Sequence, residues 1–286
     1  MTETISAIAG SKPDAPATQP AIFLPHGGGP CFFMDWTWGP ADTWHATQHF
    51  LEGLHTTLPE TPRALLVISG HWEEAAFSAS TAAAPGLIYD YSGFPAHTYH
   101  LTWPAPGDPA LGAEVAGLLD KAGLPSALDA GRGYDHGVFV PLKVAFPEAQ
   151  IPVVTLSLVS PRNGFFDPAL HIAAGRALAP LRKQGVLIIG SGMSFHNLGA
   201  YFRPDTAEAS RGFDAWLSQA AESPAPQRDA MLREWQDAPY ARFSHPREEH
   251  LVPLLVAAGA GGEAVGKRIF SDAPMGAVIS AYRFDG

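Results

Sequence analysis

Runs of apolar residues recur along the chain, and segments with a helical spacing of apolar positions lie between them. The runs AIFLP (21–25), ALLVISG (64–70), IPVVTLSLV (151–159) and VLIIG (186–190) are apolar at nearly every position. This is the pattern of strands covered on both faces. Closing strands are expected at 264–271 and 276–284, and helices at 109–124, 167–185, 205–221, 226–236 and 244–262, with a partly helical region at 36–57, a short helix within 131–147 and a long loop at 76–103. The alternation predicts an α/β fold: a single domain with a central mixed, largely parallel sheet flanked by helices.

The N-terminal segment differs in composition from the rest of the chain. Residues 1–19 are rich in Ala, Pro, Ser and Thr and lack a long apolar run, which predicts a flexible tail. Residues 20–286 contain no repeat and no clear linker. We therefore expect one domain from residue 20 to the C-terminus.

Charge and cysteine content narrow the range of partners and locations. The formal net charge is −10, so binding to nucleic acid or to an anionic membrane surface is not expected. No apolar stretch approaches the roughly 20 residues of a membrane span. The one cysteine, Cys31, cannot form an internal disulfide, which predicts a cytoplasmic protein.

Three of the apolar runs are followed by a histidine. His26 follows AIFLP, His71 follows ALLVISG, and His196 follows VLIIGSGMSF. In sheets of parallel strands with crossover helices, the carboxyl ends of the strands share one rim where ligands bind. We therefore expect these imidazoles to converge on an active site at that rim.

Two further histidines could reach the same place. His136 lies in GYDHGVF, on a loop before a short helix, and His250 lies in the first turns of the helix expected at 244–262. Neutral imidazole is a common ligand of zinc, iron and copper, and a histidine that is not a ligand can act as a general acid and base. The sequence predicts a shared metal or catalytic site.

The segment HPREEH (245–250) offers several donors. With His245 as the N-cap and Pro246 in the first helical position, Glu248 falls where a capping-box carboxylate would explain it without a metal. His245 stays open as a ligand or a partner of one, and Glu249 stays open as a carboxylate ligand. A serine nucleophile is not signalled, because GSGMS lacks the spacing of a nucleophile elbow.

Around these histidines the chain resembles the class III extradiol ring-cleavage dioxygenases, in their DOPA-dioxygenase-like branch. The matching stretches are FLPHGGGP (23–30), LVISGHWE (66–73), GFPAHTYHLTWPAPGDPAL (93–111), GYDHGVFVPL (133–142), IPVVTLSL (151–158), GSGMSFHNL (190–198) and HPREEHLVPLLVAAGA (245–260). The similarity extends from about residue 20 to the C-terminus, and the order of the blocks makes it specific.

The resemblance implies one divalent metal ion per chain, with Fe(II) for activity and Zn(II) as the alternative. By position, His26, His71 and His250 match metal ligands, His196 matches the acid/base histidine, and His136 matches a histidine that contacts substrate. The implied reaction opens the ring of a small catecholic substrate with O2 to a muconic semialdehyde-type product.

Other assignments stay open at this stage. A zinc-dependent hydrolase on the same scaffold, or a non-catalytic metal-binding protein, would use the same ligands. Aromatic residues beside the motifs could form a wall for the substrate ring: Phe32, Phe33, Trp72, Phe94, Tyr99, Tyr134 and Phe195. The sequence leaves open the substituents of the ring, the bond cleaved, the native metal, and whether the protein is a monomer or a homodimer.

Overall fold

The computed structural model describes residues 16–160 and 164–286. Its strands are β1 (Ala21–Pro25), β2 (Ala64–Glu74), β3 (Phe77–Ser80), β4 (Ser126–Asp129), β5 (Val153–Val159), β6 (Val186–Gly192), β7 (Gly266–Asp272) and β8 (Ile279–Phe284). Its helices are α1 (His45–Gly53), α2 (Pro109–Lys121), α3 (His136–Ala145), α4 (Pro168–Leu178), α5 (Thr206–Ala221), α6 (Ala225–Arg233), α7 (Ala241–Ser244) and α8 (Val252–Ala260). Short 3₁₀ segments lie at Cys31–Phe33, Leu54–Thr57, Ala96–His100, Ala179–Gln184, Trp235–Asp237 and Pro274–Gly276.

One sheet organises the molecule. Its eight strands follow the order β4-β3-β5-β2-β6-β1-β8-β7. The four central strands, β5, β2, β6 and β1, pair in parallel, whereas β8 is antiparallel to β1, β7 to β8, and β3 to β5. The predicted α/β class with a mixed, largely parallel sheet is confirmed.

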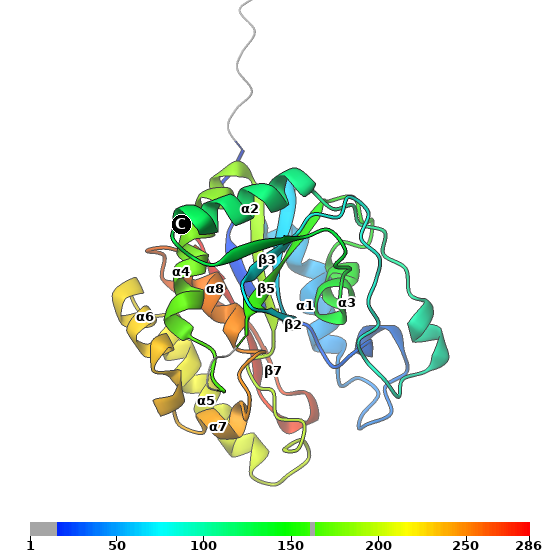
Figure 1. Cartoon of the computed structure of the whole chain (residues 1–286). Helices are drawn as coiled ribbons and strands as arrows, with labels where there is room; N and C mark the ends of the chain where they lie inside the picture. The colour runs from blue at the N-terminus through cyan, green and yellow to red at the C-terminus, as the bar shows by residue number, and fades with distance from the viewer. Residues whose placement is uncertain (1–15, 161–163) are drawn as a thin grey trace, which may run out of the picture.

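Alternate residues of the central strands face two separate cores. In β1, Phe23 packs into the core shared with α2, α4, α5 and α8, while Ile22 and Leu24 pack into the core shared with α1 and α3. The other central strands alternate in the same way, because successive side chains of a strand point to opposite faces. Figure 1 shows α2, α4 and α8 on one side of the sheet and α1 and α3 on the other.

Two helices begin with the same sequence, Asp-Pro-Ala-Leu. The carboxylate of Asp108 accepts from the Leu111 N–H at 2.9 Å, and that of Asp167 accepts from the Leu170 N–H at 3.1 Å. Proline follows each N-cap aspartate, at a position where its missing N–H costs no helical hydrogen bond. These caps fix the starts of α2 and α4, where the apolar spacing predicts helices.

Two predicted boundaries are wrong, each for a local reason. Strand β2 does not end before His71: it continues to Glu74, and its register against β5 shifts between Ile68 and Glu73. The helix expected at 244–262 is shorter, because α8 begins only at Val252 with Pro253 in its first turn. A longer helix would need an N–H at Pro253 and would bring its ring against the carbonyl oxygen four residues earlier.

The N-terminal tail expected at 1–19 lies outside the described residues up to residue 15, and it stays a prediction. From there the chain joins the domain: Gln19 is fully buried, and its N–H donates to the Arg182 carbonyl oxygen at 3.0 Å. Within residues 16–160 and 164–286, no helix combines the length and apolar character needed to cross a bilayer.

Candidate metal centre

Strand order brings the predicted site together. Strands β2, β6 and β1 are neighbours and run in parallel, so their carboxyl ends lie side by side. His26 directly follows β1, His71 lies near the end of β2, and His196 lies in the loop after β6. The turn that leads into α8 contributes His250, and the first position of α3 contributes His136.

Two glycines allow the close packing of backbone at this rim. Gly27 has a φ of +85°, and a Cβ added there would lie 2.5 Å from the Cys31 Sγ. A Cβ added at Gly192 would lie 2.1 Å from the His250 carbonyl oxygen, which also accepts a 3.0 Å hydrogen bond from the Met193 N–H. A side chain at Gly192 would displace the turn that carries His250, and one at Gly27, directly after His26, would clash with Cys31 and Phe32.

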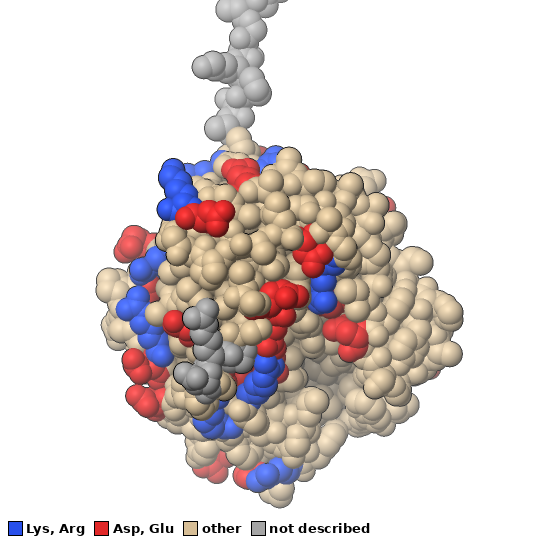
Figure 2. Space-filling model, in the orientation of Figure 1, with Lys and Arg blue, Asp and Glu red and all other residues tan. Residues whose placement is uncertain are grey.

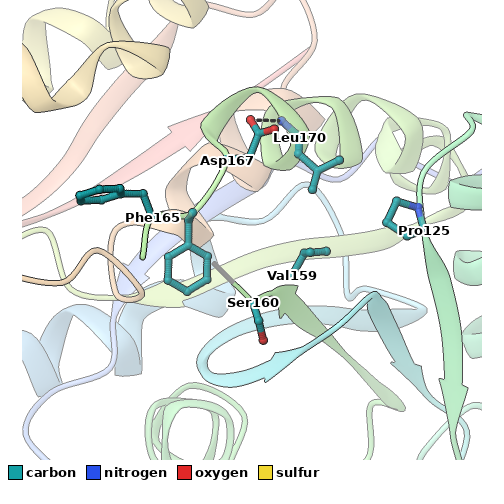
Figure 3. Close-up of a pocket in the computed structure, with 7 residues that line it drawn as sticks. Pro125, Val159, Ser160, Phe165, Asp167 and Leu170 are labelled. Carbon is teal, nitrogen blue, oxygen red and sulfur yellow. Dashed lines mark hydrogen bonds between the residues drawn. The ribbon is translucent and has the colours of Figure 1, made fainter. Parts of the chain in front are cut away.

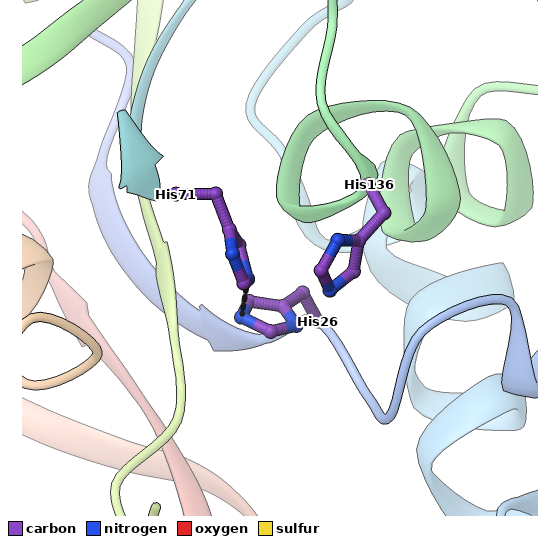
Figure 4. Close-up of side chains that lie close together, drawn as sticks. All are labelled: His26, His71 and His136. Carbon is purple, nitrogen blue, oxygen red and sulfur yellow. Dashed lines mark hydrogen bonds between the residues drawn. The ribbon is translucent and has the colours of Figure 1, made fainter. Parts of the chain in front are cut away.

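Three Nε2 atoms converge on one point. The Nε2 of His71 lies 3.3 Å from that of His26 and 3.1 Å from that of His250. Figure 4 shows the His26, His71 and His136 rings, which come from separate segments, directed toward one another. Two nitrogens bound to one zinc at about 2.1 Å with tetrahedral angles would lie about 3.4 Å apart. The observed spacing therefore fits nitrogens that share one small cation.

The opposite nitrogens of these rings face acceptors. The Nδ1 of His26 donates to the Gly27 carbonyl oxygen at 2.9 Å, and the Nδ1 of His250 donates to the Glu249 carboxylate at 2.8 Å. The Nδ1 of His71 lies 3.6 Å from the Asp90 carboxylate. With the proton on Nδ1, each Nε2 presents a lone pair, the arrangement in which a histidine binds a metal.

The same three histidines are held neutral. Burial lowers the pKa of His26, His71 and His250 well below 6.5, and neighbouring imidazoles lower it further. A neutral imidazole keeps the lone pair that a divalent ion needs, whereas a protonated one loses it.

Asp90 holds His136, although no sequence motif pointed to this aspartate. Its Oδ1 accepts from both the backbone N–H and the Nδ1 of His136, at 2.9 and 2.8 Å. Burial alone would raise the pKa of Asp90, but the hydrogen bonds and charge interactions with His136 and His71 lower it to about 2. Asp90 is therefore a carboxylate that orients two of the site imidazoles.

Glu249 holds His196 in a similar way. The ring of His196 stacks on that of His250, with centroids 3.5 Å apart, and its Nδ1 lies 3.2 Å from the Glu249 Oε1. Burial opposes ionisation of Glu249, but the His196 hydrogen bond and the neighbouring Arg247 give a net lowering of its pKa. One carboxylate thus links the Nδ1 atoms of two histidines.

All five predicted histidines lie in this cluster. Within the described residues, two groups of three have ligand atoms within 4.8 Å of one another: His26, His71 and His136 form one, and His196, Glu249 and His250 form the other. We call His26, His71, His136, His196 and His250 the site histidines. Their proximity supports a metal centre and leaves the role of each as a prediction.

His245 and Glu248 are engaged elsewhere. The Nε2 of the fully buried His245 donates to the Ser194 carbonyl oxygen at 3.0 Å, and its ring packs against Phe213 and Trp235. The capping-box role expected for Glu248 is wrong, because no helix begins at residue 246. Its carboxylate instead accepts from the Phe166 N–H at 3.1 Å and from Arg242 at 2.6 Å.

The site histidines form the floor of a cavity of about 520 Å³. Its aromatic wall consists of Trp36, Trp38, Trp44, Tyr91, Phe94, Tyr201 and Phe202. Of the aromatic residues expected from the sequence, only Phe94 lines it. The cluster of tryptophans in DWTWGPADTW, just after the glycine-rich turn, is the signal that would have found the three tryptophans of this wall.

A second cavity lies on the side of α4. It has a volume of about 410 Å³ and is lined by Pro125, Val159, Ser160, Phe165, Phe166, Asp167 and Leu170. Figure 3 shows the Asp167 carboxylate directed back to the backbone of Leu170, which it caps. This cavity has no site histidine in its lining.

Fold and site together define an α/β protein with a histidine-rich centre suited to a divalent metal. The chain belongs to the LigB family of class III extradiol dioxygenases: residues 20–284 match the family model described as the catalytic LigB subunit of aromatic ring-opening dioxygenase. The proposed resemblance is thereby confirmed.

Individual relatives agree with this membership. The chain is 38% identical to "Dioxygenase tasH" of Hapsidospora irregularis, over 93% of this chain and 86% of that protein. It is 37% identical to a 4,5-DOPA dioxygenase extradiol of Beta vulgaris, over 83% of this chain and 89% of that one. A crystal structure of an uncharacterized protein from Escherichia coli K12 superposes with a TM-score of 0.73 at 28% identity, covering 93% of this chain and all of the other. These similarities support an oxygenase enzyme.

Proposed function

We propose that the protein is a metal-dependent extradiol dioxygenase, which opens the ring of a catecholic substrate with O2 to a muconic semialdehyde-type product. His26, His71 and His250 are the proposed metal ligands, His196 the acid/base, and His136 the contact to a substrate oxygen. Both atoms of O2 enter the product, so the overall reaction needs no external reductant. A cytoplasmic location is part of this proposal, because a chain with a single cysteine cannot form an internal disulfide.

The convergence of three Nε2 atoms at 3.1 and 3.3 Å, beneath an aromatic cavity, carries this proposal. Each opposite nitrogen faces an oxygen, so the donor set suits a metal whose remaining positions open toward the cavity. When bound, a divalent metal would lower the pKa of a coordinated hydroxyl and hold substrate beside O2. Fe(II) is the proposed metal for turnover, and Zn(II) would fit the same nitrogens.

The protein's own groups would supply proton transfer and orientation. With Nδ1 of His196 held by Glu249, its Nε2 is free to accept a proton from a substrate hydroxyl and to return one later. With Nδ1 of His136 held by Asp90, its Nε2 can donate to or accept from a substrate oxygen. The aromatic wall would exclude water from the reacting ring.

Anaerobic reconstitution with Fe(II), followed by oxygen-electrode measurements on a panel of catechols, tests the proposal. We expect one O2 consumed per catechol and a yellow ring-opened product, with no turnover by the Zn(II)-loaded protein. Hydrolysis of ester or amide substrates by the Zn(II) form, without O2 uptake by the Fe(II) form, would favour a zinc hydrolase. Failure of both forms on every substrate would favour a metal-binding protein without catalysis.

A further inference from the structure

The cavity is larger than a catechol ring requires. An apolar cavity of about 150 Å³ is enough to hold benzene, whereas this one measures about 520 Å³. Pockets of roughly 300–1,000 Å³ typically enclose drug-sized molecules. A dihydroxylated ring at the histidines would therefore leave most of the cavity to a substituent.

The space beyond the histidines is bordered by large apolar side chains. Trp36 packs edge-to-face on Trp44 with ring centroids 5.7 Å apart, and Trp38 packs on Phe94 at 5.6 Å. Toward the outside, Trp38, Leu198 and Phe202 are 52%, 73% and 65% exposed, yet all three line the cavity. Apolar surface that stays open to water at a cavity mouth is suited to cover an apolar ligand.

Formal charge is missing from the same lining. Within the part of the chain that the structure describes, no Lys, Arg, Asp or Glu side chain lines this cavity. Arg203, next to Phe202, is engaged by Asp205 at 2.7 Å. The adjoining groove shares Phe202 with the cavity and carries Asp42 and Asp272, which would repel an anion.

Figure 2 agrees with this distribution. Charged side chains gather over the left and centre of the face shown, whereas the right-hand part is almost entirely uncharged. In Figure 1 that part contains the loops to the right of α3. A substrate carboxylate placed in such surroundings would lose hydration without gaining a cationic partner.

We propose, on the basis of the extradiol function proposed above, that the substrate is a catechol carrying an extended, uncharged apolar or aromatic substituent, and that an anionic substituent is selected against. The dihydroxylated ring lies at the site histidines. The substituent lies along Trp36, Trp38 and Phe94 and ends at Leu198 and Phe202.

Matched substrates test this specificity on the Fe(II)-loaded enzyme. The pairs are 3-(3,4-dihydroxyphenyl)propanoate with its methyl ester, and DOPA with 4-phenylcatechol. We expect kcat/KM to be at least about tenfold higher for the uncharged member of each pair. Burying a charge that has no partner weakens binding by at least this factor. Equal or higher kcat/KM for the propanoate or for DOPA would overturn the inference.

A binding measurement separates this inference from the reaction itself. Quenching of tryptophan fluorescence in the metal-free protein should reveal tighter binding of 4-phenylphenol than of 3-(4-hydroxyphenyl)propanoate, whether or not any catechol is opened. If the binding order holds and no catechol is turned over, only the proposed reaction fails. If the propanoate binds as tightly as 4-phenylphenol, the specificity inference fails even in an active dioxygenase.

A positive charge introduced at the mouth of the cavity tests where the substituent lies. Leu198→Arg should raise kcat/KM for the propanoate by about two- to fivefold, as expected for a solvent-exposed ion pair, and lower it for 4-phenylcatechol. Leu128→Arg is the control, because Leu128 is also exposed, at 56%, but lies in edge strand β4. The same kinetic change in both variants, or in neither, would contradict the proposed position of the substituent.

Discussion

Two sets of buried histidines in this protein look alike until their partners are compared. The site histidines gather at the rim formed by the carboxyl ends of the central strands, whereas His171, in α4, and His245, before α8, lie in the cores. His171 and His245 are fully buried and His26 is 2% exposed. Burial lowers the pKa of His171 to about 4 and that of His245 to about 3, the direction it also takes at His26. Neither burial nor a lowered pKa therefore distinguishes the site.

The difference lies in what the ring nitrogens face. Nδ1 of His171 donates to the Asp167 carbonyl oxygen at 2.7 Å, and its Nε2 accepts from the Val159 N–H at 3.2 Å. Both nitrogens are thus used by the backbone. In His26 Nδ1 bonds to a backbone carbonyl oxygen and in His250 it bonds to the Glu249 carboxylate, whereas Nε2 of each ring faces other imidazoles. His245 is held at Nε2 and its buried Nδ1 has no hydrogen-bond partner, so a free nitrogen is available for chemistry only where, as at the site histidines, the ring lines a cavity.

The largest effect is expected from removing a proposed ligand. His71→Ala should abolish metal binding and oxygen uptake, because its Nε2 lies 3.3 Å from that of His26 and 3.1 Å from that of His250. Metal content by mass spectrometry and O2 consumption measure this. Full metal content in a folded His71→Ala protein would remove His71 from the proposed ligand set.

His196→Gln should keep the metal and lose turnover. The loss of a general acid/base typically lowers kcat by about 10²- to 10⁴-fold, while the glutamine keeps much of the contact with the His250 ring. Metal content and single-turnover rates under oxygen measure the two effects separately. Wild-type turnover would exclude His196 from proton transfer, and loss of metal would assign it to the ligands instead.

Glu249→Gln should have a smaller effect on the same site. Replacing a carboxylate that holds a metal-binding histidine typically costs about 10- to 100-fold in metal affinity or activity. Glu248→Gln is the control, because this buried neighbour bonds to Phe166 and Arg242 instead of a histidine. We expect Glu248→Gln to change the free energy of unfolding and leave metal affinity and kcat unchanged. Equal losses of metal affinity in both variants would argue against a positioning role for Glu249.

The smallest functional effect is expected at His171. His171→Leu should leave kcat unchanged but lower the free energy of unfolding near pH 7 by about 1–3 kcal/mol, because the buried Val159 N–H loses its acceptor. Urea titrations of metal-free protein, with kcat measured on the metal-loaded form, test both statements. A large loss of kcat in a folded His171→Leu protein would contradict the separation of the two sets.

Lowering the pH should reduce the difference in unfolding free energy between wild type and His171→Leu. The pKa of His171 is lowered from 6.5 in the unfolded chain to about 4 in the folded protein, so the unfolded state binds the proton first as the pH falls. The contribution of His171 to the free energy of unfolding is complete above pH 6.5. It declines by up to about 3 kcal/mol as the pH falls to 4. A difference in unfolding free energy that stays constant over this range would contradict the neutral state of His171.

The sequence was sufficient to predict those strands, helix starts and site residues that depend on a local pattern of residues. Continuous apolar runs identified β1, β2, β5 and β6, and the Asp-Pro-Ala-Leu segments mark where α2 and α4 begin. His26, His71 and His196 could be placed at one rim because parallel strands align their carboxyl ends. Their positions before a short helix and in the first turns of an expected helix suggested His136 and His250, the resemblance added a role for each, and all five lie in one cluster.

Other parts depend on contacts that no local pattern encodes. Asp90 lies inside a long loop without periodicity, and only tertiary packing brings it beside His136. The start of α8 was misplaced because the signal at Pro246 resembles that at Pro253, and only Pro253 lies in the helix. The aromatic wall was missed because Trp36, Trp38 and Trp44 lie outside the histidine motifs, and only the folded chain brings them beside the histidines.

The backbone contacts of the turn at residue 250 have an evolutionary consequence. Gly192 and Met193 meet the carbonyl oxygen of His250, so main-chain atoms help hold the turn whatever side chain it presents. A mutation can therefore replace the side chain at residue 250 without a change in the surrounding backbone. In the proposed centre, the fold thus sets where the side chain of residue 250 lies, whereas a single codon sets the charge of that side chain.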